Sequence, residues 1–164
     1  CEESTQDLIF RTIQYHNRAA LPQTETKTCL FFAKLLRDAY KMDIWRVVTD
    51  YYRQKEGERN SALELDLPDT PTFSDAVYQD LINKRIVDAN YIKTLNDSKL
   101  LQIGWIFDIN FEPTLCAICA RGYLETIRDV LPKSRRIDHI FSIVHTYIEE
   151  RLKTSNEGVS SFSR

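Results

Sequence analysis

The residues best suited to catalysis or ligand binding lie in two short segments near the start of the sequence. The first is YHNRAALP, residues 15–22, in which His16 and Asn17 end an apolar helical pattern shortly before Pro22. A histidine at the end of a helix is favoured there by the helix dipole, or it is free to contact a ligand or substrate. The sequence leaves both interpretations open, and His16 and Asn17 are candidate substrate-binding residues.

The second segment is LLRDAYKMDIW, residues 35–45, which places four charges within about two turns of a predicted helix. These charges belong to Arg37, Asp38, Lys41 and Asp43. Their apolar neighbours require some of them to point towards the interior or a cleft, although such a stretch is also typical of a solvated face with pairs at i, i+4. Arg37 and Lys41 are further candidate substrate-binding residues, and the sequence contains no complete catalytic set that we recognise.

The remaining histidines and cysteines are better explained by structural positions on the surface or in the core than by catalysis or metal binding. His139 and His145 lie off the apolar stripe of the last predicted helix and are expected on its surface. Cys116 and Cys119 form a C-x-x-C, a spacing used by zinc and redox sites, but no second ligand pair accompanies them. Because both lie in an apolar helical pattern, we predict buried, reduced core thiols, which is typical of a cytoplasmic protein.

The composition is that of an ordinary globular protein. A length of 164 residues suits one domain, and 43% hydrophobic residues can form its core. Only 4 Gly and 5 Pro are present, which favours helix over strand. A formal net charge of -2 provides no broad basic field, so no nucleic-acid partner is indicated. No apolar run has the length needed to span a membrane, so no membrane partner is expected either.

The first residue is a cysteine, and the single methionine lies well inside the chain. We therefore expect that something upstream of Cys1 is absent. The alternative is a mature bacterial lipoprotein, which begins with a lipidated cysteine and would use the polar residues after Cys1 as a tether.

Apolar residues at helical spacing predict helices over six stretches of the chain. Five of them are 3–17, 24 or 26 to 54, 72–84, 97–109 and 113–131, and the sixth is the last helix, ending near 152. The predicted N-cap residues are Thr24 or Thr26, Thr72 in a capping box with Asp75, and Asn96. Between these helices, residues 56–72 form the best loop candidate.

The two longest helices have clear apolar stripes. The stripe of the long second helix is predicted to consist of Phe31, Leu35, Ala39 and Met42. The stripe of the last helix consists of Ile137, Phe141, Val144, Ile148 and Leu152. No run alternates apolar and polar residues over the length of a strand. We therefore predict an all-α protein, a single helical-bundle domain of about six or seven helices over residues 1–152, with a polar C-terminal tail over 153–164.

Together the two charged segments resemble a known family. The pattern Y-H-N-R-x-x-L-P, followed some twenty residues later by L-L-R-D-A-x-K-x-D-I-W, is similar to the HD-domain metal-dependent phosphohydrolases. LLQIGWIFDINF (100–111) and ARGYLETIRDVLP (120–132) also resemble the C-terminal helices of a bacterial subgroup of HD domain proteins. The resemblance covers about residues 8–152.

The resemblance implies an all-helical fold and a hydrolase that uses one or two divalent metals, Mn, Mg or Fe. Its members bind these metals with a His, a His-Asp pair and a later Asp. Such a metal lowers the pKa of a bound water, and the resulting hydroxide attacks phosphorus. The implied substrate is a small phosphorylated molecule or nucleotide.

The sequence departs from the family pattern in two places. The leading His and the His-Asp pair of the family lie upstream of the His16 segment, so the domain is predicted to lack its N-terminal helices. The later metal-binding Asp corresponds to Tyr40, whose neutral phenol is a poor ligand for a hard cation. His16 matches an accessory histidine near the metal or substrate, whereas Asp38 and Asp43 match positions that bind no metal. Asp43 is expected to orient or brace its helix.

Three functional hypotheses follow. The first is a truncated or catalytically impaired relative of the HD phosphohydrolases, in effect a pseudoenzyme that has lost its metal. The second is an active hydrolase whose missing residues come from an upstream segment. The third is a non-catalytic helical ligand-binding or protein-interaction module, for which the aromatic residues offer contact area and in which a homo-oligomer is an option.

Overall fold

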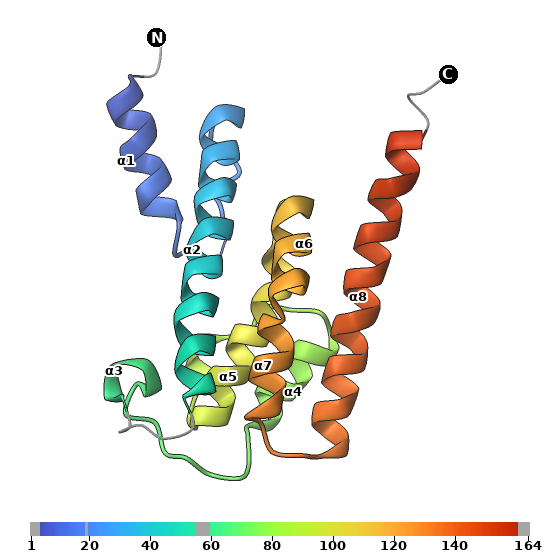
Figure 1. The fold of residues 1–164 in the computed structure, drawn as a ribbon. Helices are drawn as coiled ribbons and strands as arrows, with labels where there is room; N and C mark the ends of the chain where they lie inside the picture. The colour runs from blue at the N-terminus through green and yellow to red at the C-terminus, as the bar shows by residue number, and fades with distance from the viewer. Residues whose placement is uncertain (1–3, 19, 55–59, 161–164) are drawn as a thin grey trace.

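The protein is all-helical, as predicted. The computed structural model describes residues 4–18, 20–54 and 60–160, with side chains as far as residue 154. Within these ranges the chain forms eight α-helices and two short 3-10 helices, and none of the described residues belongs to a strand. In Figure 1 most helices gather into one bundle, while α1 stands at one side next to α2. Cys1 lies outside the described residues.

The first two helices form a hairpin. Helix α1 (Thr5–Tyr15) begins at Ser4, whose side chain accepts a hydrogen bond from the Asp7 amide. Helix α2 (Lys27–Arg53) begins in the same way at Thr26, which confirms one of the two predicted caps. The helix then continues without interruption for 27 residues, along the full height of the bundle (Figure 1).

The predicted apolar stripe of α2 is wrong for three of its four residues, whereas Met42 packs against the core of the bundle. Phe31 and Leu35 are about half exposed, and Ala39 is exposed as well. The buried residues of this helix are Cys29, Ala33, Arg37, Asp38, Lys41, Trp45, Val48 and Thr49. The helix is therefore rotated so that its charged residues face the bundle. The physical reason is that buried charges must find partners, and these partners lie on the segment after α5, which periodicity within α2 does not reveal.

The middle of the chain contains short helices. Residues 56–72 were predicted as a loop, and their described part contains the single-turn helix α3 (Ser61–Glu64). Helix α4 (Asp75–Ile82) begins after Ser74 and not after the predicted Thr72. The 3-10 helix η1 (Ala89–Tyr91) lies between α4 and the next long helix.

Helix α5 (Leu95–Gly104) carries the capping box of this region. Thr94 accepts from the Asp97 amide, and the Asp97 carboxylate accepts from the Thr94 amide. The predicted cap, Asn96, is a buried residue inside the helix, so that prediction was two residues late. The 3-10 helix η2 (Trp105–Asp108) follows directly and completes the helix expected over 97–109.

The helix predicted over 113–131 is two helices. Helix α6 (Glu112–Arg121) has its proline in the first turn, as expected, and α7 (Tyr123–Asp129) follows after a break at Gly122. Gly122 has φ +63°, a left-handed conformation that glycine adopts without steric cost and that ends a helix. Because this glycine lies within a continuous apolar helical pattern, the boundary between α6 and α7 was not predicted from the sequence.

The last helix, α8 (Arg135–Ser160), closes the bundle and continues past residue 152. Ile137, Phe141, Val144 and Ile148 are buried on one face of it, which confirms the predicted stripe. They join the main core, which α2, α4, α5, α6 and α7 also enter, and which includes the fully buried Trp45 of α2.

A second, smaller cluster attaches α1 to α2. It consists of Tyr15, Cys29 and Ala33, with Leu8 and Leu21 packed against them. No helix among the described residues combines the length and the apolar character required to cross a membrane.

Candidate functional site

The charged residues of α2 meet a single carboxylate on η2. The Arg37 side chain is 5% exposed, and its Nη2 donates to Asp108 Oδ2 at 2.5 Å. The ammonium of Lys41 donates to the same oxygen and, at 3.1 Å, to the backbone oxygen of Asp108. Burial lowers the pKa of Lys41, and the hydrogen bond to Asp108 opposes that shift. Two cations thus share one acidic partner inside the bundle.

The same arginine also holds the end of α1. Arg37 Nη1 donates to the backbone oxygen of Tyr15 at 3.4 Å and to that of Arg18. Carbonyl groups at the end of a helix have no partner within the helix and favour a cation. Arg37 therefore connects three segments: α2, the end of α1, and η2.

Asp38, the next residue, acts as a cap for a different helix. Its carboxylate accepts from the amides of Asn110 and Phe111, each at 3.0 Å, and from Asn110 Nδ2 at 2.9 Å. Helix α6 begins at Phe111, whose own side chain cannot accept a hydrogen bond. Asp38 thus supplies, from another helix, the acceptor that an N-cap residue normally provides.

These contacts account for the charges that the sequence singled out. Arg37, Asp38 and Lys41 are all buried, in agreement with the expectation that some of them face the interior. Asp43 is exposed and pairs with Arg46 one turn further along α2, at 2.9 Å. The residue that sequence reasoning missed is Asp108. The sequence feature that could have identified it is that Asp108 is the only acidic residue in the apolar stretch LLQIGWIFDINF.

The two positions that the family resemblance relates to the metal site are also in contact with each other. The rings of His16 and Tyr40 touch edge to face, with centroids 5.0 Å apart. His16 Nδ1 lies 2.6 Å from the backbone oxygen of Ile13, and the Tyr40 side chain is partly exposed. Asn17, the neighbour of His16, is exposed. The fold thus joins the end of α1 to the middle of α2 at the surface.

The donor set at this place does not fit a divalent metal. The Nδ1 of His16 is engaged with a carbonyl, Tyr40 offers a phenol, and Asp38 directs both oxygens towards α6. Among the residues that the structure describes, no group of three or more His, Cys, Asp or Glu side chains is placed to hold a metal ion. The chemistry of these donors therefore gives no support to a metal-dependent step at this position.

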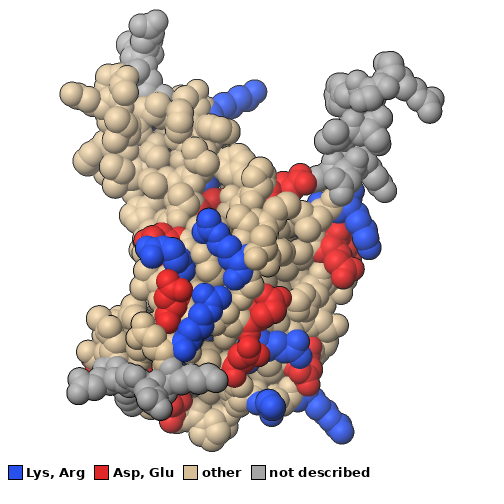
Figure 2. All heavy atoms as spheres, in the orientation of Figure 1, with Lys and Arg blue, Asp and Glu red and all other residues tan. Residues whose placement is uncertain are grey.

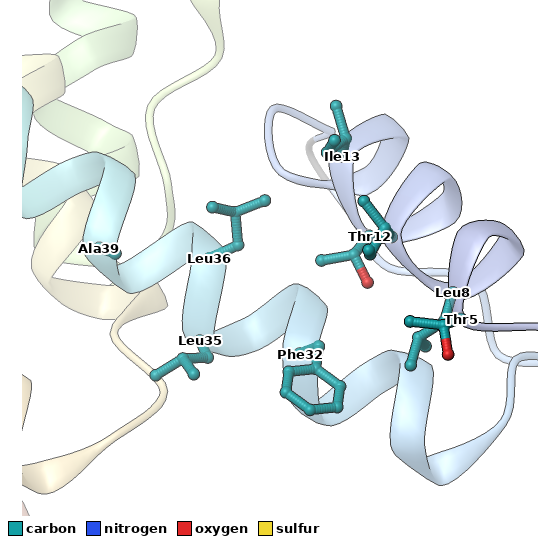
Figure 3. A pocket seen from close by; sticks show the side chains of 9 residues that line it. Thr5, Leu8, Thr12, Ile13, Phe32, Leu35, Leu36 and Ala39 are labelled. Carbon is teal, nitrogen blue, oxygen red and sulfur yellow. The ribbon is translucent and has the colours of Figure 1, made fainter.

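An apolar cavity lies between α1 and α2. Its volume is about 510 Å³, and it is lined by Thr5, Leu8, Ile9, Thr12, Ile13, Phe32, Leu35, Leu36 and Ala39. Figure 3 shows Leu36 pointing from α2 towards α1, with Thr12 opposite it. Three of the lining residues are the half-exposed Ile9, Ile13 and Leu35. The face of α2 that was expected to be core thus forms one wall of an open groove.

A second cavity, about 460 Å³ in volume, is polar and lies beside Lys99 at the opposite end of the bundle. The buried Lys99 ammonium donates to the Val130 backbone oxygen at 3.1 Å and to Asn96 Oδ1 at 3.4 Å. Burial lowers the pKa of Lys99. Because Val130 ends α7, this lysine caps a helix C-terminus, so we assign it a structural role.

Of the other candidates, the cysteines depart from expectation. Cys116 and Cys119 are exposed, so the prediction of buried core thiols is wrong for both. Helix α6 instead directs Leu115 and Ile118 into the core, which turns the cysteines away from it. Of the histidines on α8, His139 is exposed as predicted, and its Nδ1 lies 2.8 Å from the hydroxyl of Tyr78.

Comparison of the chain with protein-family models, with curated proteins and with solved structures finds no match. The resemblance to HD phosphohydrolases therefore depends on the sequence motifs alone, and the all-helical fold is the part of it that the structure shows.

We predict that Asp108→Asn destabilises the protein strongly. Asparagine removes the shared counter-charge and leaves Arg37 and Lys41 buried without an anion. Breaking a buried pair costs several kcal/mol, and because the Asp108 side chain is 22% exposed we expect a loss of roughly 2–3 kcal/mol in the free energy of unfolding. Urea denaturation measures this loss. The matched control is Asp43→Asn, which breaks an exposed pair and should cost at most about 0.5 kcal/mol. Equal effects of the two variants would contradict the role of Asp108.

A separate contact makes the docking of α1 sensitive to pH. Glu25, just before α2, accepts from the Tyr15 hydroxyl and pairs with Arg11 at 2.8 Å. The hydrogen bond from Tyr15 lowers the pKa of Glu25 below its usual 4.5, and the same bond raises the pKa of Tyr15. The folded state therefore favours the ionised Glu25 carboxylate.

We predict that α1 loosens in acid. A lowered pKa gives stability that is present above pH 4.5 and lost as the pH falls through the folded-state value. Amide NMR spectra between pH 6 and pH 3 should show the resonances of α1 changing before those of α8. In Glu25→Gln this early change should disappear, because the titrating group is gone. Glu149→Gln, at an exposed pair on α8, should leave it unaltered. An early change that persists in Glu25→Gln would refute the assignment.

Proposed function

We propose that this chain is a relative of the HD phosphohydrolases that acts without metal catalysis, as a helical binding module. The observation that carries the proposal is the use of the charged motif. The residues that would serve phosphate chemistry, Arg37 and Lys41, are buried and paired with Asp108. The motif thus maintains the packing of α1, α2 and α6 in place of a reaction centre.

A phosphate would have to compete with these internal partners. Both terminal nitrogens of Arg37 already donate, one towards α1 and the other to Asp108. A ligand at Arg37 would therefore displace Asp108 or release the end of α1, and either change leaves buried polar groups without partners. This cost supports a structural role for the motif and weighs against an anion site there.

The apolar groove between α1 and α2 supports the binding role. Contiguous apolar surface of this kind on a soluble protein typically marks an interaction site. The walls of the groove come from both helices, and the Tyr15–Glu25 and Arg37–Tyr15 contacts hold the hairpin together. Recognition would therefore be hydrophobic and would depend on the hairpin geometry.

We predict that the purified chain shows no metal-dependent phosphatase activity. After dialysis with Mn²⁺ it should retain no stoichiometric metal by elemental analysis. It should also fail to turn over p-nitrophenyl phosphate or a panel of nucleotides with Mn²⁺ or Mg²⁺. Turnover that is abolished by a chelator and restored by the metal would overturn the proposal.

The contact between His16 and Tyr40 favours a second candidate, a hydrolase completed by residues from outside this chain. It brings together the two positions that the resemblance associates with the metal. Under this hypothesis Tyr40→Asp would put a carboxylate beside the imidazole and should produce measurable Mn²⁺ binding in calorimetry. Tyr40→Phe, which removes the hydroxyl and adds no ligand, is the matched control. If Tyr40→Asp binds no more Mn²⁺ than Tyr40→Phe does, position 40 is not a metal position.

A further inference from the structure

The apolar groove belongs to a larger uncharged face, which we call the α1–α2 face. It consists of the groove-lining residues together with Phe31 and Tyr40, which adjoin them on α2. Its large exposed side chains are Ile9 (55% exposed), Ile13 (54%), Phe31 (50%), Phe32 (42%), Leu35 (46%) and Tyr40 (38%). Single exposed apolar residues are ordinary on a protein surface, whereas a group of six on one face is typical of an interaction site.

The size of this face fits one half of a protein interface. An aromatic side chain presents about 200 Å² and the apolar part of Ile or Leu about 100 Å², so the exposed fractions amount to on the order of 400 Å². One partner of a standard interface contributes about 800 Å², of which roughly 57% is apolar, or about 450 Å². The apolar area therefore matches what one subunit supplies to a stable dimer.

The shape of the face suits a helix. Ile9 and Ile13 are four residues apart on α1, and Phe32 and Leu36 repeat the same spacing on α2. Rows with this spacing form the ridges and grooves through which helices pack against one another. The residues that line the groove come from both helices (Figure 3). Its natural occupant is therefore a helix with an apolar ridge, and α1 and α2 each present such a ridge.

The charge distribution favours a second copy of the chain as the source of that helix. A symmetric dimer brings each surface against itself, so a face rich in one sign of charge would repel its own copy. No charged residue lines the groove. Figure 2 agrees, since the surface over α1 and the start of α2 is largely uncharged in this view, while charged side chains gather further down the bundle. Self-association of this face therefore carries no like-charge penalty.

We infer that the chain forms a twofold-symmetric dimer through the α1–α2 face, in which the two hairpins pack into a four-helix bundle. The inference rests on the proposed binding role of this face and names its partner. Leu35 and Ile9, from different helices, would both lie inside the interface. Both are about half exposed in the single chain, so replacing either of them leaves the main core intact.

Sedimentation velocity over a concentration series tests the dimer. The wild-type chain should sediment as a dimer at micromolar concentration. Leu35→Glu and Ile9→Glu should each raise the dissociation constant at least about 100-fold, because each buries two uncompensated charges per dimer. Ile86→Glu is the matched control. It makes the same apolar-to-acid change at a residue of similar exposure (37%) outside the face, between α4 and η1, and it should leave the dimer unchanged.

Three outcomes would overturn the inference. They are a wild-type chain that stays monomeric at about 100 µM, a dimer that survives both substitutions, and a monomer whose groove binds the apolar dye ANS in a manner lost in Leu35→Glu. The last outcome would assign the groove to a small apolar ligand. Circular dichroism checks that each variant is folded. Because the two substitutions lie on separate helices, the test still holds if one of the variants misfolds. Failure of the dimer is distinguishable from failure of the proposed function, which would appear as chelator-sensitive turnover.

Discussion

The partly buried carboxylate of Asp108 is the constraint on which the arrangement of the helices depends. It neutralises Arg37 and Lys41, two cations that face the interior from successive turns of α2. A buried charge without a partner is costly, so α2 can pack only in the rotation that brings both cations to Asp108. Arg37 extends this constraint to the end of α1, and Asp38 extends it to the start of α6.

This rotation of α2 has a consequence on the opposite side of the helix. Because the charged residues face inwards, Phe31, Leu35 and Ala39 face outwards, where α1 covers them incompletely. The apolar groove is therefore produced by the internal electrostatics of the bundle. The hairpin that forms it is held by the Tyr15–Glu25 contact, whose strength depends on ionisation of the carboxylate.

The charged residues of this helix segment serve packing between helices. In the segment RDAYK, Arg37, Asp38 and Lys41 all serve contacts between helices, whereas Tyr40 lies at the surface against His16. The apolar face lies on the exposed side of the same helix, apart from these internal contacts.

The sequence by itself determined the all-helical class and the apolar stripe of α8, and it limited the cap of α2 to Thr24 or Thr26, because these follow from local spacing and capping within one segment. It also indicated that charges of α2 face inwards. Only the tertiary structure decided which side of α2 is buried, because Asp108 lies 71 residues from Arg37 and no local period records that pairing. The exposure of Cys116 was decided in the same way, since both faces of α6 are apolar in sequence and its neighbours select the one that is covered.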